Sequence, residues 1–582
     1  MSGCGRTRPL GAGELRVTAA VPVLVAVLVY WGALHNGFVW DDPTVLVQMR
    51  AMGSARDLVV MPPVVPKFYY RPFVFVSYLA DRAIAGETPF WFHASVVLWH
   101  ALNTLLVFVL ARQLFPADWV IASGGALLFA VYPTHVESVA WMAGRSDVIA
   151  CAFMLVTVIL AGRRTRAAFA WLAGLGYLLA LLSKESAIAC LALVPAFDRM
   201  ATGTWYPRRY VPLVLATVLY FALRNLSLGV PVGGWPAPGS TVDVVLDLVR
   251  AVGFYVKHAV VPVGLNAYVP TVPRDPLLLA IGAGAPLVSV GLLLRAWRQR
   301  NWGIAYLILW FWIALAPSLV VIVRRSASAA VADRYLYVPT VGSCVLGAVL
   351  CAHGAARLRL ARCWSVAATL VLALVFTWQT IPYVRVWRDN LTFWSDVAAK
   401  APDEALPHRE VGAALVAAGR LDDAEQAYRR ALAAHPDPAL EATTYSNLGN
   451  LYRRMGRLDE AEQAFEQALR RGPHPMTLHN LGMTVMARIE RAQKQGKLEL
   501  VDRDLARARD LFQQALDVGT APGAEQAFIE WDAAKTHALL GQVLFFMGDR
   551  PAARAQFEAS LRLRPAGPLA DISRQFLQRL GS

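Results

Sequence analysis

Long apolar runs separated by short polar segments dominate the first two-thirds of the chain. A helix needs about 20 mostly apolar residues to cross a membrane. Eleven runs approach this length, at 17–34, 91–111, 118–133, 137–160, 167–182, 186–197, 210–226, 276–294, 302–323, 335–353 and 364–382. The pattern predicts a polytopic helical membrane domain over residues 1–382, with about eleven transmembrane helices.

One further apolar stretch, 245–263, contains Arg250, Lys257 and His258. Ionisable side chains are costly in lipid. Counting this stretch as a span would also move the basic residues near 295–300 to the opposite side of the membrane. We therefore expect a re-entrant segment or an amphipathic helix at the membrane surface.

The apolar runs stop near residue 382, and an internal repeat follows. Its residues share fixed offsets: Gly412, Ala424, Tyr428, Ala431 and Pro436; Gly449, Ala461, Phe465, Ala468 and Pro473; Gly541, Ala553, Phe557 and Pro565. A degenerate copy contains Gly482, Ala508, Phe512 and Ala515, with roughly fourteen extra residues inside it. This spacing resembles the tetratricopeptide repeat, a helix–turn–helix unit that stacks into an α-solenoid. We expect an all-α protein, with a linker over 383–402 and a repeat domain over 403–582.

Composition agrees with a membrane domain, since 56% of the residues are hydrophobic, 17% are charged, and the mean hydropathy is +0.43. A net charge of +15 would by itself suggest a nucleic-acid partner. However, residues 383–582 hold 26 basic and 26 acidic groups, so the whole surplus lies in the apolar part. We therefore expect no nucleic-acid partner. The six cysteines show no CxxC spacing, which argues against zinc or redox chemistry.

Basic clusters predict how the membrane domain is oriented. With a cytoplasmic N-terminus and alternating spans, they fall on the cytoplasmic side: Arg163-Arg164-Arg166, Arg208-Arg209, Arg295-Arg298-Arg300 and Arg357-Arg359-Arg362. An odd number of spans then puts the repeat domain on the external side. The Arg- and Ala-rich composition, with little lysine, favours a bacterial inner membrane with periplasmic repeats.

Ionisable residues gather on the predicted external face, where they are functional candidates. They are Asp41, Asp42, Arg71, His135, Glu137, Arg145, Asp147, Lys184, Glu185 and Arg334. A carboxylate can take the proton from an attacking hydroxyl, and Arg or Lys can hold a phosphate leaving group. The chain has no P-loop and no cytoplasmic domain large enough for a nucleotide-sugar fold. The pattern therefore favours a donor embedded in the membrane.

The order of these motifs resembles the transmembrane and tetratricopeptide-repeat O-mannosyltransferases and their bacterial relatives, which are GT-C-type glycosyltransferases. The motifs are segment 36–42 (NGFVWDD), Arg71-Pro72, segment 132–140 (YPTHVESVA), segment 144–147 (GRSD), segment 183–185 (SKE) and segment 333–339 (DRYLYVP). The resemblance implies inverting transfer of a sugar, typically mannose, from a polyprenyl-phosphate carrier to a hydroxyl of a protein or glycan. The repeats would bind the acceptor or a partner protein.

The resemblance also implies roles for the candidate residues. Asp41 or Asp42 is the catalytic base, with Asp41 favoured because it stands at the family's first acidic position. The other candidates would bind the substrates: Arg71, His135, Glu137, Arg145, Asp147, Lys184, Glu185 and Arg334. Among these, Arg145, Lys184 and Arg334 are the expected phosphate ligands. No dedicated set of metal ligands is visible, although Asp41-Asp42 leaves room for a divalent cation.

Plainer interpretations remain open for several of these residues. Asp41-Asp42 could cap a helix ahead of Pro43, and Lys184-Glu185 could be a snorkelling pair at the membrane surface. His93 and His100 are spaced like metal ligands on one helix face, but packing is the better interpretation without a third ligand. At the level of the whole chain, the alternative is a non-enzymatic membrane scaffold for envelope proteins. A lipid-linked-sugar flippase would show inverted repeats, which the sequence lacks.

Overall fold

The computed structural model describes residues 12–62, 65, 69–163, 167–229, 240–324, 329–496, 499–521 and 531–581. Over these residues the secondary structure is helical, apart from one isolated bridge between Val269 and Val331. The prediction of an all-α chain is confirmed. The chain divides into two compact units, Met1–Phe393 and Trp394–Ser582, and the break falls inside helix α16 (Asn390–Lys400).

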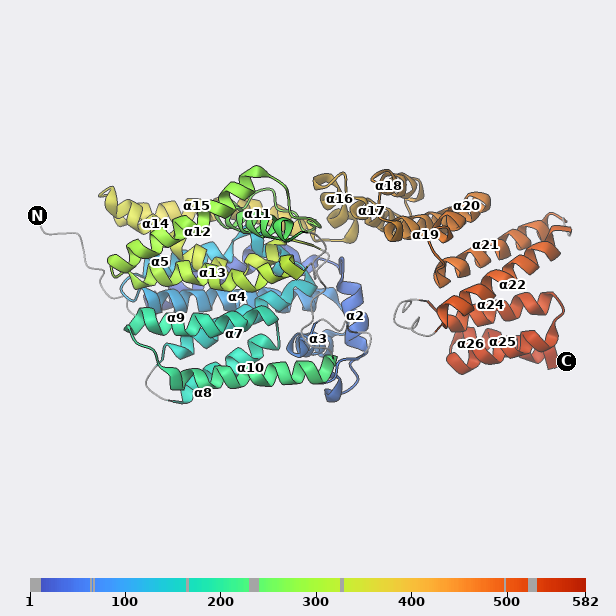
Figure 1. Ribbon diagram of the computed structural model, residues 1–582, viewed down its shortest axis with the longest axis horizontal. Coiled ribbons are helices and arrows are strands. Elements are labelled where there is room, and N and C mark those ends of the chain that lie inside the picture. Colours follow the sequence, from blue (N-terminus) through green and yellow to red (C-terminus); the bar gives the residue numbers. More distant parts are fainter. Residues whose placement is uncertain are drawn as a thin grey trace, which may run out of the picture. The chain divides into compact units, whose positions relative to one another are not determined.

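The first unit is a bundle of long helices that run side by side (Figure 1). The α-helices are α1 (Ala12–Val29), α2 (Asp42–Arg50), α3 (Pro72–Ala85), α4 (Pro89–Leu114), α5 (Trp119–Ala130), α6 (Val136–Val139), α7 (Arg145–Ala161), α8 (Ala168–Leu181), α9 (Cys190–Thr202), α10 (Pro207–Leu228), α11 (Thr241–Val260), α12 (Pro276–Arg298), α13 (Trp302–Arg324), α14 (Thr340–Arg357) and α15 (Arg362–Val386). Short 3₁₀ turns join several of them: η1 (Trp31–His35), η2 (Ala55–Leu58), η3 (Pro133–His135), η4 (Met142–Gly144), η5 (Glu185–Ala189) and η6 (Asp333–Leu336).

Eight helices of the described residues are long and apolar enough to cross a membrane. The segments Trp119–Ala130 and Pro133–Val139, bent by 47° at their junction, would make a ninth span. The chain is thus a multi-pass membrane protein. Each of the eleven predicted spans overlaps a helix, but α8, with 14 residues, and α9, with 13, are shorter than the candidate spans. The full number of crossings therefore stays a prediction.

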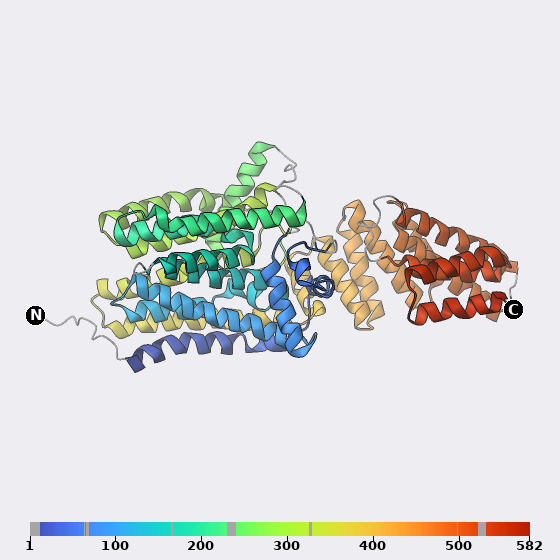
Figure 2. The same cartoon turned by 90° about the horizontal axis from the view of Figure 1, so that it is seen from below.

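Helix α11 covers most of the stretch 245–263, up to Val260, and does not run with the bundle. Figures 1 and 2 show it crossing the long helices, as a surface helix would. It packs on α12 with almost no space between the backbones. A Cβ at Gly253 would lie 1.9 Å from the carbonyl oxygen of Leu278, and a Cβ at Gly282 would lie 1.8 Å from that of Val249. Only glycine fits at these two positions.

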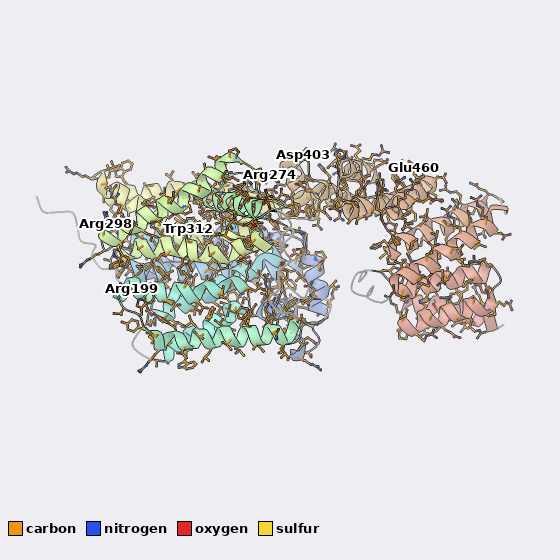
Figure 3. The ribbon with its side chains drawn as sticks, viewed as in Figure 1. Arg199, Arg274, Arg298, Trp312, Asp403 and Glu460 are labelled. Carbon is orange, nitrogen blue, oxygen red and sulfur yellow. The ribbon has the colours of Figure 1, made fainter. Side chains whose placement is uncertain are left out.

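Two basic residues of the first unit mark the end of the bundle opposite the acidic pair (Figures 1 and 3). Arg199 and Arg298 lie together at that end, whereas Arg274 lies at the other (Figure 3). Two further basic residues meet each other, since the guanidinium of Arg209, in the first turn of α10, donates to the carbonyl of Arg163, just after α7, at 3.0 Å. Arg164 and Arg166 of the first predicted cluster lie outside the described residues. We call the end that carries α2, η5 and η6 the site end.

The second unit is a series of antiparallel helix pairs (Figure 1). Its helices after α16 are α17 (Ala405–Ala417), α18 (Leu421–Ala433), α19 (Pro438–Arg454), α20 (Leu458–Leu469), α21 (Pro475–Lys494), α22 (Glu499–Gly519), α24 (Ala533–Phe546), α25 (Arg550–Leu563) and α26 (Pro568–Gly581). The degenerate copy absorbs its extra residues by lengthening both helices, to 20 residues in α21 and 21 in α22.

Glycine and aromatic residues explain the spacing of the repeat. In each of four helix pairs the glycine of the first helix faces an aromatic ring of the second. A Cβ at Gly412, Gly449, Gly482 or Gly541 would lie 2.6, 2.7, 2.7 or 2.9 Å from a ring carbon of Tyr428, Phe465, Phe512 or Phe557, respectively. The prediction of four units, including the degenerate one, agrees with this packing.

Candidate active site

The loop before α2 is held in a strained conformation next to the acidic pair. Trp40 has a φ of +54°, in the left-handed region that a bulky residue rarely enters. Its ring stacks on Trp141 at 4.9 Å between centroids and on Phe393 at 5.6 Å. Its N–H donates to the Asn390 side chain at 2.9 Å. Such strain persists only where surrounding contacts fix it, and it clusters at functional sites.

The two neighbouring acids have different environments. Asp42 is fully buried, and its two carboxylate oxygens accept the N–H groups of Val39 at 2.9 Å and Ala143 at 3.0 Å. Burial raises the pKa of Asp42 from 3.8 to about 7. Asp41, in contrast, is exposed. It occupies the N-cap position of α2, as the capping interpretation expects, but its side chain makes no capping hydrogen bond.

Three ion pairs lie at the site end. Arg71 forms a two-pronged pair with Glu185, at 2.8 and 3.1 Å from Oε2. The Lys184 ammonium lies 2.5 Å from Asp147 Oδ2. The pairs come from separate segments: Arg71 precedes α3, Lys184 and Glu185 precede or begin η5, and Asp147 is in the first turn of α7.

The third pair joins Arg334 of η6 to Glu137 of α6. The Arg334 guanidinium binds Glu137 Oε1, while its backbone N–H donates to Oε2 at 2.9 Å. The three pairs form one cluster, and the cations in it affect one another. Burial lowers the pKa of Lys184 most, and the nearby charges of Arg71 and Arg334 lower it further. The carboxylate of Asp147 raises the pKa of Lys184 and so opposes these effects.

Aromatic rings connect this cluster to the loop of the acidic pair. The Arg334 guanidinium lies 5.7 Å from the ring centre of Trp141, which stacks on Trp40. Tyr335 is shared, with its ring centre 5.1 Å from Arg334 Cζ and 5.1 Å from Lys184 Nζ. The structure thus brings the cations together and links them to the residue before Asp41.

Arg145 lies within the fold and does not face the surface. It is fully buried, with Nη1 at 2.6 Å from Asp81 Oδ2 and 3.2 Å from Ser77 Oγ. Nη2 donates to the Phe92 carbonyl at 2.8 Å, and Cζ lies 4.3 Å above the Tyr78 ring. This geometry makes Arg145 a residue that joins α3, α4 and α7, and its expected contact with phosphate stays a prediction.

His135 is also enclosed. Its ring is fully buried, with Nδ1 at 3.0 Å from the Phe129 carbonyl and Nε2 at 2.7 Å from Thr340 Oγ1. His93 and His100 each contact a backbone carbonyl, of Gly37 and Ala130 respectively. No group of three metal-binding side chains is found among the described residues. All three histidines make packing contacts, and the expected role of His135 in substrate binding stays a prediction.

Two features of the site end were missed from the sequence. The first is Trp40, whose ring contacts and backbone strain fix the loop before α2. The second is His258, which had no predicted role of its own within the stretch 245–263, yet its Nδ1 lies 2.7 Å from Asp333 Oδ1. The signal for His258 was present, because a histidine near the end of an amphipathic helix needs a polar partner when it is buried.

An apolar groove lies between α5 and α11–α15. Its volume is about 330 Å³. Side chains such as Phe311, Trp312, Leu350 and Phe376 form its walls, and Trp312 lies within the length of the bundle (Figure 3). Tyr132 also lines it, with its hydroxyl donating to the Ala259 carbonyl at 2.7 Å. The groove thus reaches α11, the helix that carries His258.

Sequence comparisons relate both units to known proteins. A tetratricopeptide repeat family profile matches residues 403–472. The human protein O-mannosyl-transferase TMTC1 is 24% identical over 524 residues, which cover 78% of this chain and 58% of that protein. The Drosophila melanogaster protein O-mannosyl-transferase Tmtc1 is 33% identical over 188 residues, covering 30% of this chain and 22% of that protein. The chain thus spans less than two-thirds of the length of these relatives.

Among solved structures, ArnT from Cupriavidus metallidurans bound to undecaprenyl phosphate is 15% identical, with a TM-score of 0.40, over 68% of this chain and 81% of that one. A likeness at this level adds nothing to the sequence relatives. The chain is a homologue of the TMTC-type protein O-mannosyl-transferases, and it joins a multi-span helical domain to tetratricopeptide repeats.

Proposed function

We propose that this protein is a GT-C-type membrane glycosyltransferase. It transfers a sugar, mannose by its resemblance, from a polyprenyl phosphate to a hydroxyl of a protein or glycan. The observation that carries the proposal is the exposed Asp41, which follows the strained Trp40 in a loop linked through Trp141 to the cluster of three cations. A base and a phosphate-binding cluster at one membrane face are the two parts that this transfer needs.

Asp41 acts as the base. The acceptor hydroxyl oxygen attacks C1 of the sugar, and its proton passes to the Asp41 carboxylate. The C1–O bond to phosphate breaks on the opposite face, so the configuration at C1 inverts and the polyprenyl phosphate leaves. Asp42 has a different role, since both of its oxygens are occupied by backbone N–H groups and it orders the loop.

The cations Arg71, Lys184 and Arg334 stabilise the leaving phosphate. Arg71 and Arg334 keep 22% and 14% of their side-chain surface exposed, so a ligand can reach them. Their carboxylate partners hold them in place before the donor binds, which avoids the cost of ordering long side chains during the reaction. Lys184 is more enclosed, with 8% of its side-chain surface exposed, and contributes its charge from within the fold.

The donor's isoprenoid chain occupies the apolar groove. The groove has the chemistry for a hydrocarbon chain, since its walls are aliphatic and aromatic residues of membrane helices. The groove connects to the cations through a series of contacts. Tyr132 lines the groove and its hydroxyl binds the turn of α11 that carries His258. His258 in turn binds Asp333, the neighbour of Arg334.

A divalent cation fits Asp41-Asp42 poorly. Asp42 is fully buried and its carboxylate accepts two backbone N–H groups inside the fold, whereas Asp41 is exposed, so the two carboxylates do not share one environment in which to hold a metal. We propose that the three cations, and no metal held by this pair, balance the charge that develops on phosphate.

We further propose that the site end faces away from the cytoplasm, in a bacterial inner membrane, with the repeats in the periplasm. Arg199 and Arg298 lie at the opposite end, which supports this orientation through the positive-inside rule (Figure 3). The repeats would bind the protein acceptor, because stacked tetratricopeptide units offer a concave surface for extended segments.

The test compares glycans and glycoproteins of cells that carry the wild-type chain, Asp41→Asn or no gene, by mass spectrometry. We expect a hexose-bearing product that disappears with the gene and with Asp41→Asn, while the variant inserts and melts like the wild type. Asp275→Asn is the matched control, since Asp275 is also an exposed acid at the start of a helix. A glycan profile unchanged by deletion would favour the scaffold instead, and full activity of Asp41→Asn would remove Asp41 as the base.

A further inference from the structure

His258 forms a buried polar contact at the site end, outside the set of candidate site residues predicted from the sequence. It is 2% exposed and lies in the last turn of α11. Its Nδ1 is 2.7 Å from Oδ1 of Asp333, which is fully buried and begins η6. A buried carboxylate needs such a partner, because leaving it unpaired inside the fold is costly. The position of η6 therefore depends on α11.

The same turn of α11 is fixed against the apolar groove. The Tyr132 hydroxyl donates to the carbonyls of Ala259, at 2.7 Å, and His258, at 3.3 Å. The Phe254 ring lies 4.1 Å from the His258 ring. Since Tyr132 and Ala259 both line the groove, a chain lodged there touches the turn that holds Asp333.

The residue after Asp333 is Arg334, and its backbone is part of the site. The Arg334 N–H donates to Glu137 Oε2 at 2.9 Å while its guanidinium binds Oε1. This two-point contact forms only if η6 presents the N–H and the side chain of Arg334 together. A shift of η6 would separate them, because both oxygens belong to one fixed carboxylate.

We propose that His258 is a positioning residue for the lipid donor. It holds Asp333, and thereby the turn that presents Arg334 to phosphate. The phosphate and the chain of the donor are thus bound by elements that meet at one turn of α11. The inference rests on the proposed function, because it requires that Arg334 binds the phosphate of a lipid.

The test measures how tightly the purified full-length protein, in lipid nanodiscs, binds undecaprenyl phosphate and undecaprenol, which lacks the phosphate. His258→Leu removes the contact with Asp333. His258→Asn keeps an N–H donor near the position of Nδ1. Lys257→Gln, at the preceding position of α11, is the matched control. Native mass spectrometry gives each affinity, and thermal unfolding without ligand reports whether each variant is folded.

We expect the wild type to prefer undecaprenyl phosphate. His258→Leu should bind it about tenfold more weakly, the size of a lost hydrogen bond to a charged group, while binding undecaprenol as before. His258→Asn and Lys257→Gln should keep the wild-type preference. If His258→Leu does not fold, Asp333→Leu, which removes the acceptor of the same contact, replaces it with the same expectation.

Two other results would count against different claims. If His258→Leu weakened the binding of both lipids equally, or the binding of neither, the positioning role would be overturned while the proposed function stayed in place. Equal binding of both lipids by the wild type would instead contradict the phosphate site itself, and with it the proposed function.

Discussion

Raising the pH should destabilise this protein through Asp42. Burial raises the pKa of its carboxyl to about 7 in the folded chain, against 3.8 for an ordinary aspartate. Between these two values the folded state binds a proton at Asp42 that the unfolded state has already lost. Folding stability therefore falls as the pH rises through this window, and falls no further above pH of about 7.

The size of the effect follows from the difference between the two pKa values. Each unit corresponds to about 1.4 kcal/mol, so a difference of roughly 3 units gives a loss of roughly 4 kcal/mol over the window. Asp42→Asn cannot titrate and carries no charge into the buried site. The variant gives up one of the two acceptors for the N–H groups of Val39 and Ala143, a fixed cost of about 1 kcal/mol.

The assay is denaturant unfolding of both proteins in nanodiscs, from about pH 4 to about pH 8, with the difference in free energy plotted against pH. The variant should be slightly less stable than the wild type at the acid end and more stable at the alkaline end. A difference that instead favours the wild type as the pH rises would refute the reasoning. It would mean that the two N–H groups stabilise the carboxylate more than burial penalises it.

Three further predictions follow from packing and charge. Arg145→Leu leaves the Asp81 carboxylate without its guanidinium partner inside the bundle, so the free energy of unfolding should fall by about 3–5 kcal/mol, and the double variant with Asp81→Leu should recover part of it. Gly253→Ala should lower the thermal midpoint, because its Cβ would overlap the backbone of α12 at a cost of about 1–3 kcal/mol or more. Gly284→Ala is the control and should leave the midpoint unchanged, because its Cβ would meet nothing within 4 Å. Gly449→Val should open the repeats, so limited proteolysis should cut the second unit sooner while the membrane unit survives.

Helix positions and repeats could be predicted from the sequence because each depends on a local rule. Apolar length alone marks a candidate span. The repeat depends on a glycine and a ring at a fixed offset, as in Gly449 and Phe465, because any Cβ would overlap the ring. Such signals need no knowledge of distant parts of the chain.

The roles of the individual residues within the site could not be predicted in the same way. Asp41 and Asp42 are adjacent in sequence, but one helical step turns one side chain to solvent and the other into the fold. Whether Arg145 meets phosphate or Asp81 depends on how α3 and α7 pack, which no motif encodes. The partner of His258 lies 75 residues away in η6, so only the fold reveals it.

The pairing of each cation with its own carboxylate has a consequence for substrate choice. Arg71, Lys184 and Arg334 are matched by Glu185, Asp147 and Glu137, so the cluster as a whole carries no net charge. A neutral cluster exerts little long-range attraction and does not enrich dissolved anions around itself. Water-soluble sugar phosphates would therefore reach it only by chance collision. If the donor is lipid-linked, as proposed above, it arrives by diffusion in two dimensions, and the membrane then selects it before any of the six side chains touches it.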